Sequence, residues 1–146
     1  MRQITESDSR IRADRLPNGV RIVTEHMPVS KTASLGIWIE AGSRHEAPGQ
    51  EGMAHLMEHM AFKGTARRDA LTIAKELDTL GGLSNAFTSR EATCFHVRVM
   101  DAHLARAFDI LSDIVLRPLL DPEELAREQA VILQEISMVE ETPEEK

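Results

Sequence analysis

Five consecutive residues, His55-Leu56-Met57-Glu58-His59, combine two imidazoles and a carboxylate at a spacing that suits a metal ion. On a helix, side chains four positions apart project from the same face, so His55 and His59 could bind one cation. Glu58 shares that face. A carboxylate beside a metal-bound water can take its proton, because the metal lowers the pKa of that water toward neutrality. This short segment therefore predicts a metal site that activates water.

A third metal ligand is predicted near the end of the chain. Glu128 and Glu135 are seven residues apart, which places them two helical turns apart on one face. The helical neighbours of Glu135 are apolar; they are Val131, Ile132, Met138 and Val139. An unpaired carboxylate in an apolar stripe is costly to desolvate, so the pattern favours metal binding by Glu135. Two histidines and one carboxylate would leave the fourth zinc position open for water, as in catalytic zinc sites.

The elements that would position these residues follow from apolar periodicity and turn signals. Pro17-Asn18-Gly19 lies between two strand-like segments and predicts a hairpin. The predicted strands are residues 12–16, 20–25, 32–41, 83–88 and 93–100. The predicted helices are residues 52–63, 69–80, a third from 101, and a fourth from 121 to about 141. This order predicts an α+β fold, with an antiparallel-rich sheet covered by helices.

Capping residues and apolar stripes predict how two of these helices begin and pack. Asp101 and Asp121 are the expected N-caps of the third and fourth helices, and Pro122 suits the first helical position of the fourth. Gly81-Gly82 is expected to end the helix before it. The buried stripe of the third helix is expected to use Leu104, Ala107 or Phe108, Leu111, and Ile114 or Val115.

Length and composition limit the kind of protein. The 146 residues fit a single domain, 1–146, with 42% hydrophobic and 28% charged residues. A net charge of −7 argues against nucleic acid as a partner, since that role needs clustered Lys and Arg. No apolar run is long enough to cross a membrane. The single Cys94 cannot form an internal disulfide, and we interpret it as a small buried hydrophobe.

Four blocks of the sequence carry a resemblance to a known family. They are residues 42–44 (GSR), 52–65 (GMAHLMEHMAFKGT), 85–93 (NAFTSREAT) and 128–136 (EQAVILQEI). Together they closely resemble the signature of the pitrilysin-type (M16) metallopeptidases. The most similar subgroup holds the mitochondrial processing peptidase β-subunit and its bacterial relatives. Matching blocks span about residues 16–141, nearly the whole chain, and are far more specific than the five-residue motif.

The resemblance implies a zinc-dependent endopeptidase that acts on extended peptides. The implied ligands of one Zn²⁺ per chain are His55, His59 and Glu135. Glu58 would be the general base, and Glu128 would support the metal ligands without binding the metal itself. The strand at Asn85-Ala86 would be a sheet edge on which substrate lies as an added strand.

In length the chain departs from the family that it resembles. Family members are typically clamshells of two related halves, each larger than this chain, and the distal half supplies an Arg-Tyr pair near the substrate carbonyl. This sequence contains no Tyr. We therefore expect it to be the N-terminal, catalytic portion, which needs a C-terminal half or a partner subunit; a homo-oligomer is an alternative. The lack of a signal peptide favours a bacterial cytoplasmic protein, with the mitochondrial matrix as the alternative.

Two other functions remain open. A noncatalytic zinc-binding subunit or scaffold of the same family would share the motif, although such proteins usually lose a ligand or the base. A metal-dependent lyase of the S-ribosylhomocysteine type shares an inverted His-x-x-Glu-His motif. That chemistry resembles a site with a Cys ligand and a second Cys, whereas Cys94 is the only cysteine here.

Overall fold

The computed structural model describes residues 11–141 of the chain. The chain divides into two compact units, Met1–Lys31 and Thr32–Lys146. The extent of the domain, predicted as residues 1–146, stays a prediction. Among the described residues, no helix is long and apolar enough to cross a membrane.

The described part of the first unit is a β-hairpin. Strands β1 (Ile11–Arg15) and β2 (Arg21–Glu25) pair antiparallel. The turn closes through hydrogen bonds from Leu16 N to Val20 O (2.8 Å) and from Gly19 N to Leu16 O (2.9 Å). Gly19 has a φ of +93°, a conformation that side-chain-bearing residues rarely adopt. The hairpin predicted around Pro17-Asn18-Gly19 is therefore confirmed.

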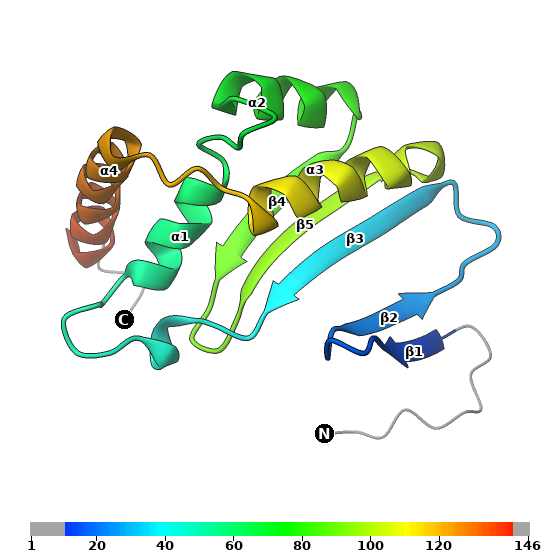
Figure 1. The fold of residues 1–146 in the computed structure, drawn as a ribbon, viewed down its shortest axis with the longest axis horizontal. Helices are drawn as coiled ribbons and strands as arrows, with labels where there is room; N and C mark the ends of the chain where they lie inside the picture. Colours follow the sequence, from blue (N-terminus) through cyan, green and yellow to red (C-terminus); the bar gives the residue numbers. More distant parts are fainter. Residues whose placement is uncertain (1–10, 142–146) are drawn as a thin grey trace. The chain divides into compact units, whose positions relative to one another are not determined.

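The second unit is built on a three-stranded antiparallel sheet in the order β3-β5-β4 (Figure 1). The strands are β3 (Thr32–Ile39), β4 (Leu83–Thr88) and β5 (Thr93–Met100). In the register, Phe95 at the centre of β5 faces Ile37 on one side and Ala86 on the other. Since β5 is central, β4 is an edge of this sheet among the described strands.

The described part of this unit also contains four α-helices. They are α1 (Met53–Ala61), α2 (Ala70–Thr79), α3 (Leu104–Leu116) and α4 (Pro122–Glu141), with short 3-10 turns at Ser43–His45 and Asp101–His103. Figure 1 shows α3 lying along one face of the sheet. The core forms there from one side of β5 and the buried stripes of α2 and α3; its fully buried members include Ile73, Val97, Ala107, Ile110 and Ile114. The predicted α+β architecture is confirmed.

Helix capping agrees with the prediction at one site and differs at another. Asp121 Oδ1 accepts from Glu123 N (2.9 Å) and Glu124 N (3.1 Å), so the predicted cap of α4 is confirmed. Asp101 does not cap α3. It begins a 3-10 turn that precedes the helix, and its Oδ1 accepts from the adjacent Ala102 N at 2.8 Å. The carboxylate is therefore satisfied one turn before α3 begins.

The buried stripe of α3 also differs in part from the prediction. Leu104 and Phe108 are exposed, whereas Ala107 and Ile110 are fully buried. Of the alternatives 107 or 108, the structure selects Ala107. A small side chain at this position lets the helix lie close to the sheet, which a phenylalanine would hinder.

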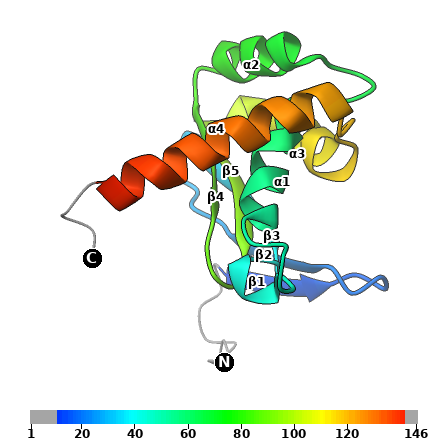
Figure 2. The same ribbon diagram turned by 90° about the vertical axis from the view of Figure 1, so that its left-hand side faces the viewer.

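The last helix, α4, packs against α1. Ile132 of α4 joins Leu56 and Met60 of α1 in a small apolar cluster, and Leu125 packs against it. The two helices are neighbours in Figure 1, and in Figure 2 α4 crosses the end of α1. This contact brings together two helices that are far apart in the sequence of the second unit.

Candidate metal centre

Three predicted ligands from two helices converge in the structure. His55 Nε2 and His59 Nε2 are 3.1 Å apart on α1. Glu135 Oε2 on α4 lies 3.7 Å from His55 Nε2 and 3.9 Å from His59 Nε2. The three side chains thus offer ligand atoms within 4.8 Å of one another. Residues 76 positions or more apart in sequence meet here because α4 packs along α1.

The geometry of this group fits zinc. Tetrahedral bonds of about 2.1 Å place neighbouring ligand atoms about 3.4 Å apart. The observed separations of 3.1, 3.7 and 3.9 Å bracket that value. Two imidazole nitrogens and one carboxylate oxygen are also a donor set found in catalytic zinc sites, which keep one position for water. The residues could therefore hold Zn²⁺ with small side-chain adjustments.

The reason given for selecting Glu135 from the sequence is wrong in part. Its side chain is 47% exposed, and Val131 and Met138 beside it are exposed as well. Of the apolar neighbours with a described side chain, only Ile132 is buried; the side chain of Val139 lies outside the described residues. The cost of desolvation therefore does not identify Glu135 as a candidate ligand. Its short distances to the two histidines do identify it.

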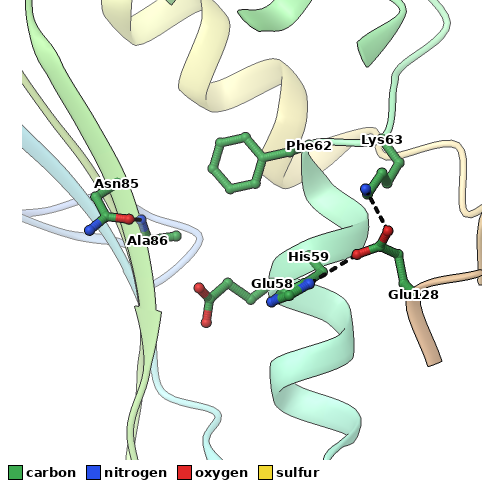
Figure 3. A pocket seen from close by; sticks show the side chains of 7 residues that line it. All are labelled: Glu58, His59, Phe62, Lys63, Asn85, Ala86 and Glu128. Atoms are coloured by element: carbon green, nitrogen blue, oxygen red, sulfur yellow. Dashed lines mark hydrogen bonds and ion pairs between the residues drawn. The ribbon is translucent and has the colours of Figure 1, made fainter. Parts of the chain in front are cut away.

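The buried carboxylate of the site belongs to Glu128. Its Oε2 lies 2.9 Å from His59 Nδ1 and its Oε1 lies 2.5 Å from Lys63 Nζ (Figure 3). Burial raises the pKa of Glu128, but the hydrogen bonds from Lys63 and His59 outweigh it and hold that pKa below its ordinary value. An ionised carboxylate only accepts, so His59 Nδ1 donates. In the neutral ring this leaves Nε2 without a proton and free to bind a metal.

Lys63 was not identified from the sequence. A signal was present, because Lys63 follows His59 by four residues and one turn of helix would place both on one face. The helix α1 ends at Ala61, and Lys63 N donates to Met60 O at 3.1 Å in the turn that follows. The turn keeps Lys63 close to the direction that a continued helix would have given it.

Glu58, the predicted base, extends from α1 toward strand β4 (Figure 3). Its Oε2 accepts a hydrogen bond from Thr88 Oγ1 at 2.5 Å. A pocket of about 280 Å³ lies between the two elements; its lining residues are Glu58, His59, Phe62, Lys63, Asn85, Ala86 and Glu128. The structure therefore places the predicted base, the predicted substrate strand and the support of His59 around one cavity. No spacing in the sequence pointed to Thr88.

The N-terminus of α1 is held by a residue from the preceding loop. Glu46 Oε2 accepts from Gly52 N (2.9 Å) and Glu46 Oε1 accepts from Ala54 N (2.8 Å). A carboxylate at this end satisfies unpaired N–H groups and complements the helix dipole. Glu46 thus stabilises the first turn of the helix that carries His55.

The same loop is also fixed to the turn between β4 and β5. Ser43 N donates to Ser89 O (3.1 Å), and Arg44 N donates to Arg90 O (2.9 Å). A Cβ at Gly42 would lie 2.3 Å from Ser89 O, so glycine is required by the close approach of the two backbones. These contacts set α1 relative to β4, and hence Glu58 relative to Thr88.

Cys94 lies apart from this chemistry. It is fully buried on β5, burial raises the pKa of its thiol, and the group of possible metal ligands among the described residues contains no cysteine. The interpretation of Cys94 as a small buried hydrophobe agrees with this environment. A lyase site with a cysteine ligand gains no support.

Comparison with known proteins gives a consistent set of relatives. A family model described as insulinase, peptidase family M16, matches residues 21–146. The chain is 44% identical over 128 residues to the uncharacterized zinc protease YmxG of Bacillus subtilis, covering 88% of this chain and 31% of that protein. It is 43% identical over 129 residues to a probable mitochondrial-processing peptidase subunit beta of Arabidopsis thaliana, covering 88% of this chain and 24% of that one.

A solved structure is similar as well. The crystal structure of a protease from Helicobacter pylori aligns with a TM-score of 0.81 and 27% sequence identity, covering 86% of this chain and 30% of the other. The chain therefore spans about a quarter to a third of the length of these relatives.

Proposed function

Because this chain belongs to peptidase family M16, we propose that it is the N-terminal, zinc-binding portion of an endopeptidase that hydrolyses extended peptides. The observation that carries the proposal is the convergence of His55, His59 and Glu135, with ligand atoms within 4.8 Å of one another. The pocket beside them supports the same function, since it is lined by both the candidate base and the candidate substrate strand.

The roles of the site residues follow from their places. His55, His59 and Glu135 would hold one Zn²⁺. When bound, this ion would lower the pKa of a water molecule and polarise the scissile carbonyl. Glu58 would accept the proton of the attacking water and donate it to the leaving amine. Its bond from Thr88 orients the carboxylate toward β4. Glu128 would orient His59 by accepting its Nδ1–H.

The substrate would bind as a strand added to the edge of β4 at Asn85 and Ala86. Two observations support this. Among the described strands, β4 pairs with β5 alone, and Ala86 lines the same pocket as Glu58. Asn85 Oδ1 accepts from Ala86 N at 2.9 Å, so an incoming strand would have to displace the Asn85 side chain to use that N–H.

The remainder of the active site would come from elsewhere. Since the chain spans about a quarter to a third of its relatives, we propose that a C-terminal half or a partner subunit supplies the groups that stabilise the oxyanion. A second copy of this chain is the alternative source. We therefore expect the 146 residues alone to bind zinc and to cleave peptides poorly.

The first experiment measures zinc content by mass spectrometry in the wild-type chain and in Glu58→Gln. We expect one zinc per chain in both, because the substitution removes the base and spares the ligands. Loss of zinc from Glu58→Gln would show that the roles are wrongly assigned, and a zinc-free wild type would refute the proposal.

The second experiment restores the missing part. The chain would replace the matching segment of the B. subtilis relative, and cleavage of an unstructured peptide would be measured with and without Glu58→Gln. We expect cleavage that Glu58→Gln reduces by at least about 100-fold, the lower end of the usual contribution of a general base. A folded, zinc-loaded chimera without activity would favour the noncatalytic subunit.

A third experiment tests the lyase alternative by measuring the zinc content of Cys94→Ser. If this variant keeps its zinc, as we expect, the lyase alternative is excluded.

A further inference from the structure

Lys63 lies outside the proposed catalytic groups, yet it contacts the support of the metal site. Its ammonium is 2.5 Å from Glu128 Oε1, and the other oxygen of that carboxylate is 2.9 Å from His59 Nδ1. The Glu128 side chain is only 8% exposed. One buried carboxylate therefore joins Lys63 to His59, and dashed lines mark the two contacts in Figure 3.

The backbone on both sides of Lys63 is held firmly. Lys63 N donates to Met60 O (3.1 Å), and the next residue, Gly64, accepts from Leu119 N through its carbonyl oxygen (2.9 Å). Leu119 belongs to the segment that leads into α4, and its side chain would meet a Cβ at Gly64 at 3.7 Å. Lys63 thus sits at the point where the end of α1 contacts the approach to α4.

Apart from these contacts and the approach of Glu135 to the two histidines, α1 and α4 pack through a small apolar cluster. Leu56 and Met60 meet Ile132, with Leu125 beside them. Apolar packing is not directional, so it leaves α4 some freedom to rotate about its axis or slide. The contacts of Glu128 with Lys63 and His59 are directional and fix both movements.

The rotation of α4 about its axis decides how close the Glu135 carboxylate lies to the two histidines. Seven residues separate Glu128 from Glu135, a distance of about 10 Å along a helix and nearly two whole turns. Glu135 is half exposed, so packing does not hold its carboxylate. A small rotation of α4 at Glu128 would carry Glu135 Oε2 away from the two histidines.

We propose that Lys63 is a positioning residue of the metal centre, which fixes the Glu128 carboxylate and, through it, both the ring of His59 and the rotation of α4 that brings Glu135 to the site. The inference rests on the proposed zinc-binding function. It adds a residue that lines the pocket but is neither a proposed metal ligand nor the proposed base.

The test is the zinc affinity of Lys63→Met, measured by competition with a chromogenic chelator. Residues that orient metal ligands typically change metal affinity by 10- to 100-fold, and we expect a loss of about 10-fold with one zinc still bound at saturation. Lys63→Arg should recover most of the affinity, because it restores a cation next to Glu128. Lys75→Met, on the exposed side of α2, removes the same charge away from the site and should leave the affinity unchanged.

A double-mutant cycle separates positioning from general stability. If Lys63 acts through Glu128, Lys63→Met combined with Glu128→Gln should bind zinc about as well as Glu128→Gln alone. Independent, additive losses would overturn the proposal, as would unchanged affinity in Lys63→Met. Should Lys63→Met fail to fold, Lys63→Gln keeps a polar group at the end of the side chain and serves in the same cycle. A wild type that binds no zinc would refute the proposed function instead, so the two failures are distinguishable.

Discussion

Two groups of charged side chains in the second unit differ in how their charges are compensated. In the arginine cluster, Arg68 contacts Glu76, Asp109 and Asp113, and its own side chain is only 4% exposed. Arg67 and Arg106 add further contacts to the same carboxylates. In the histidine cluster, by contrast, His55, His59 and Glu135 approach one another with no cation between them among the described residues.

The difference is one of burial and net charge. Asp113 is completely buried, and an isolated charge there would be very costly, so guanidinium groups surround it. Around the histidine cluster, Glu58, Glu128 and Glu135 contribute three negative charges, and Lys63 is the one cation that the described structure brings into contact with them. Three carboxylates against one ammonium leave a charge of −2, which a divalent cation would neutralise. The arginine cluster is thus compensated within the chain, whereas the remaining negative charge at the histidine cluster supports the proposed zinc site.

The largest effect is expected from Arg68→Met. Removing one partner of a buried ion pair typically costs about 3–5 kcal/mol, because the remaining charge stays buried. Urea unfolding of the metal-free chain would measure it. Arg127→Met, which removes only exposed contacts to Glu123 and Glu124, is the matched control and should cost at most about 1 kcal/mol. Similar losses in both variants would contradict the assigned structural role.

The next largest effect is expected from Glu135→Gln. Structural zinc, held by four protein ligands, contributes about 10–16 kcal/mol, or roughly 3 kcal/mol a ligand. Losing one of the three ligands proposed here should therefore weaken zinc binding by at least about 100-fold. Metal competition would measure this, and the unfolding free energy of the metal-free chain should hardly change because Glu135 is half exposed. The control is Glu123→Gln on the exposed first turn of α4. Full zinc affinity in Glu135→Gln would remove this residue from the ligand set.

A smaller effect should appear at acidic pH. Hydrogen bonds from Arg67 and Arg68 lower the pKa of Asp109 to about 2, from an ordinary value of 3.8. Because this pKa is lower in the folded than in the unfolded chain, the ionised Asp109 stabilises the folded state above about pH 4. This stabilisation is lost as the pH falls from about 4 to about 2. Asp109 is about one third exposed, so solvent screening limits its share to about 1 kcal/mol. In Asp109→Asn, the free energy of unfolding should therefore fall less steeply between about pH 4 and about pH 2. An unchanged slope would contradict a lowered pKa for Asp109.

The smallest effect is expected from Glu46→Ala. The substitution removes the carboxylate that accepts from Gly52 N and Ala54 N at the start of α1, which should cost about 1 kcal/mol or less. Thermal unfolding would measure it, with Glu51→Ala in the same loop as the control. A loss of zinc affinity larger than the loss of stability would show that Glu46 also sets the position of His55.

Much of this molecule can be predicted from local sequence. The hairpin at Pro17-Asn18-Gly19, the capping of α4 by Asp121 and the pairing of His55 with His59 on one helix each depend on residues a few positions apart. Short-range rules of turn geometry and helical spacing therefore suffice for them. The family resemblance further specified Glu135 and Glu128, which local rules alone could not connect to α1.

Only the tertiary structure decided how distant elements meet. It turned Glu58 toward Thr88, and it buried Glu128 while leaving Glu135 half exposed. It also connected Lys63 to the site through Glu128. Burial and long-range contacts depend on which faces pack together, and a single apolar stripe does not say how far along a helix that packing continues. For this reason the sequence by itself determined the ligand types and their local spacing, and the packing of α4 on α1 decided their geometry.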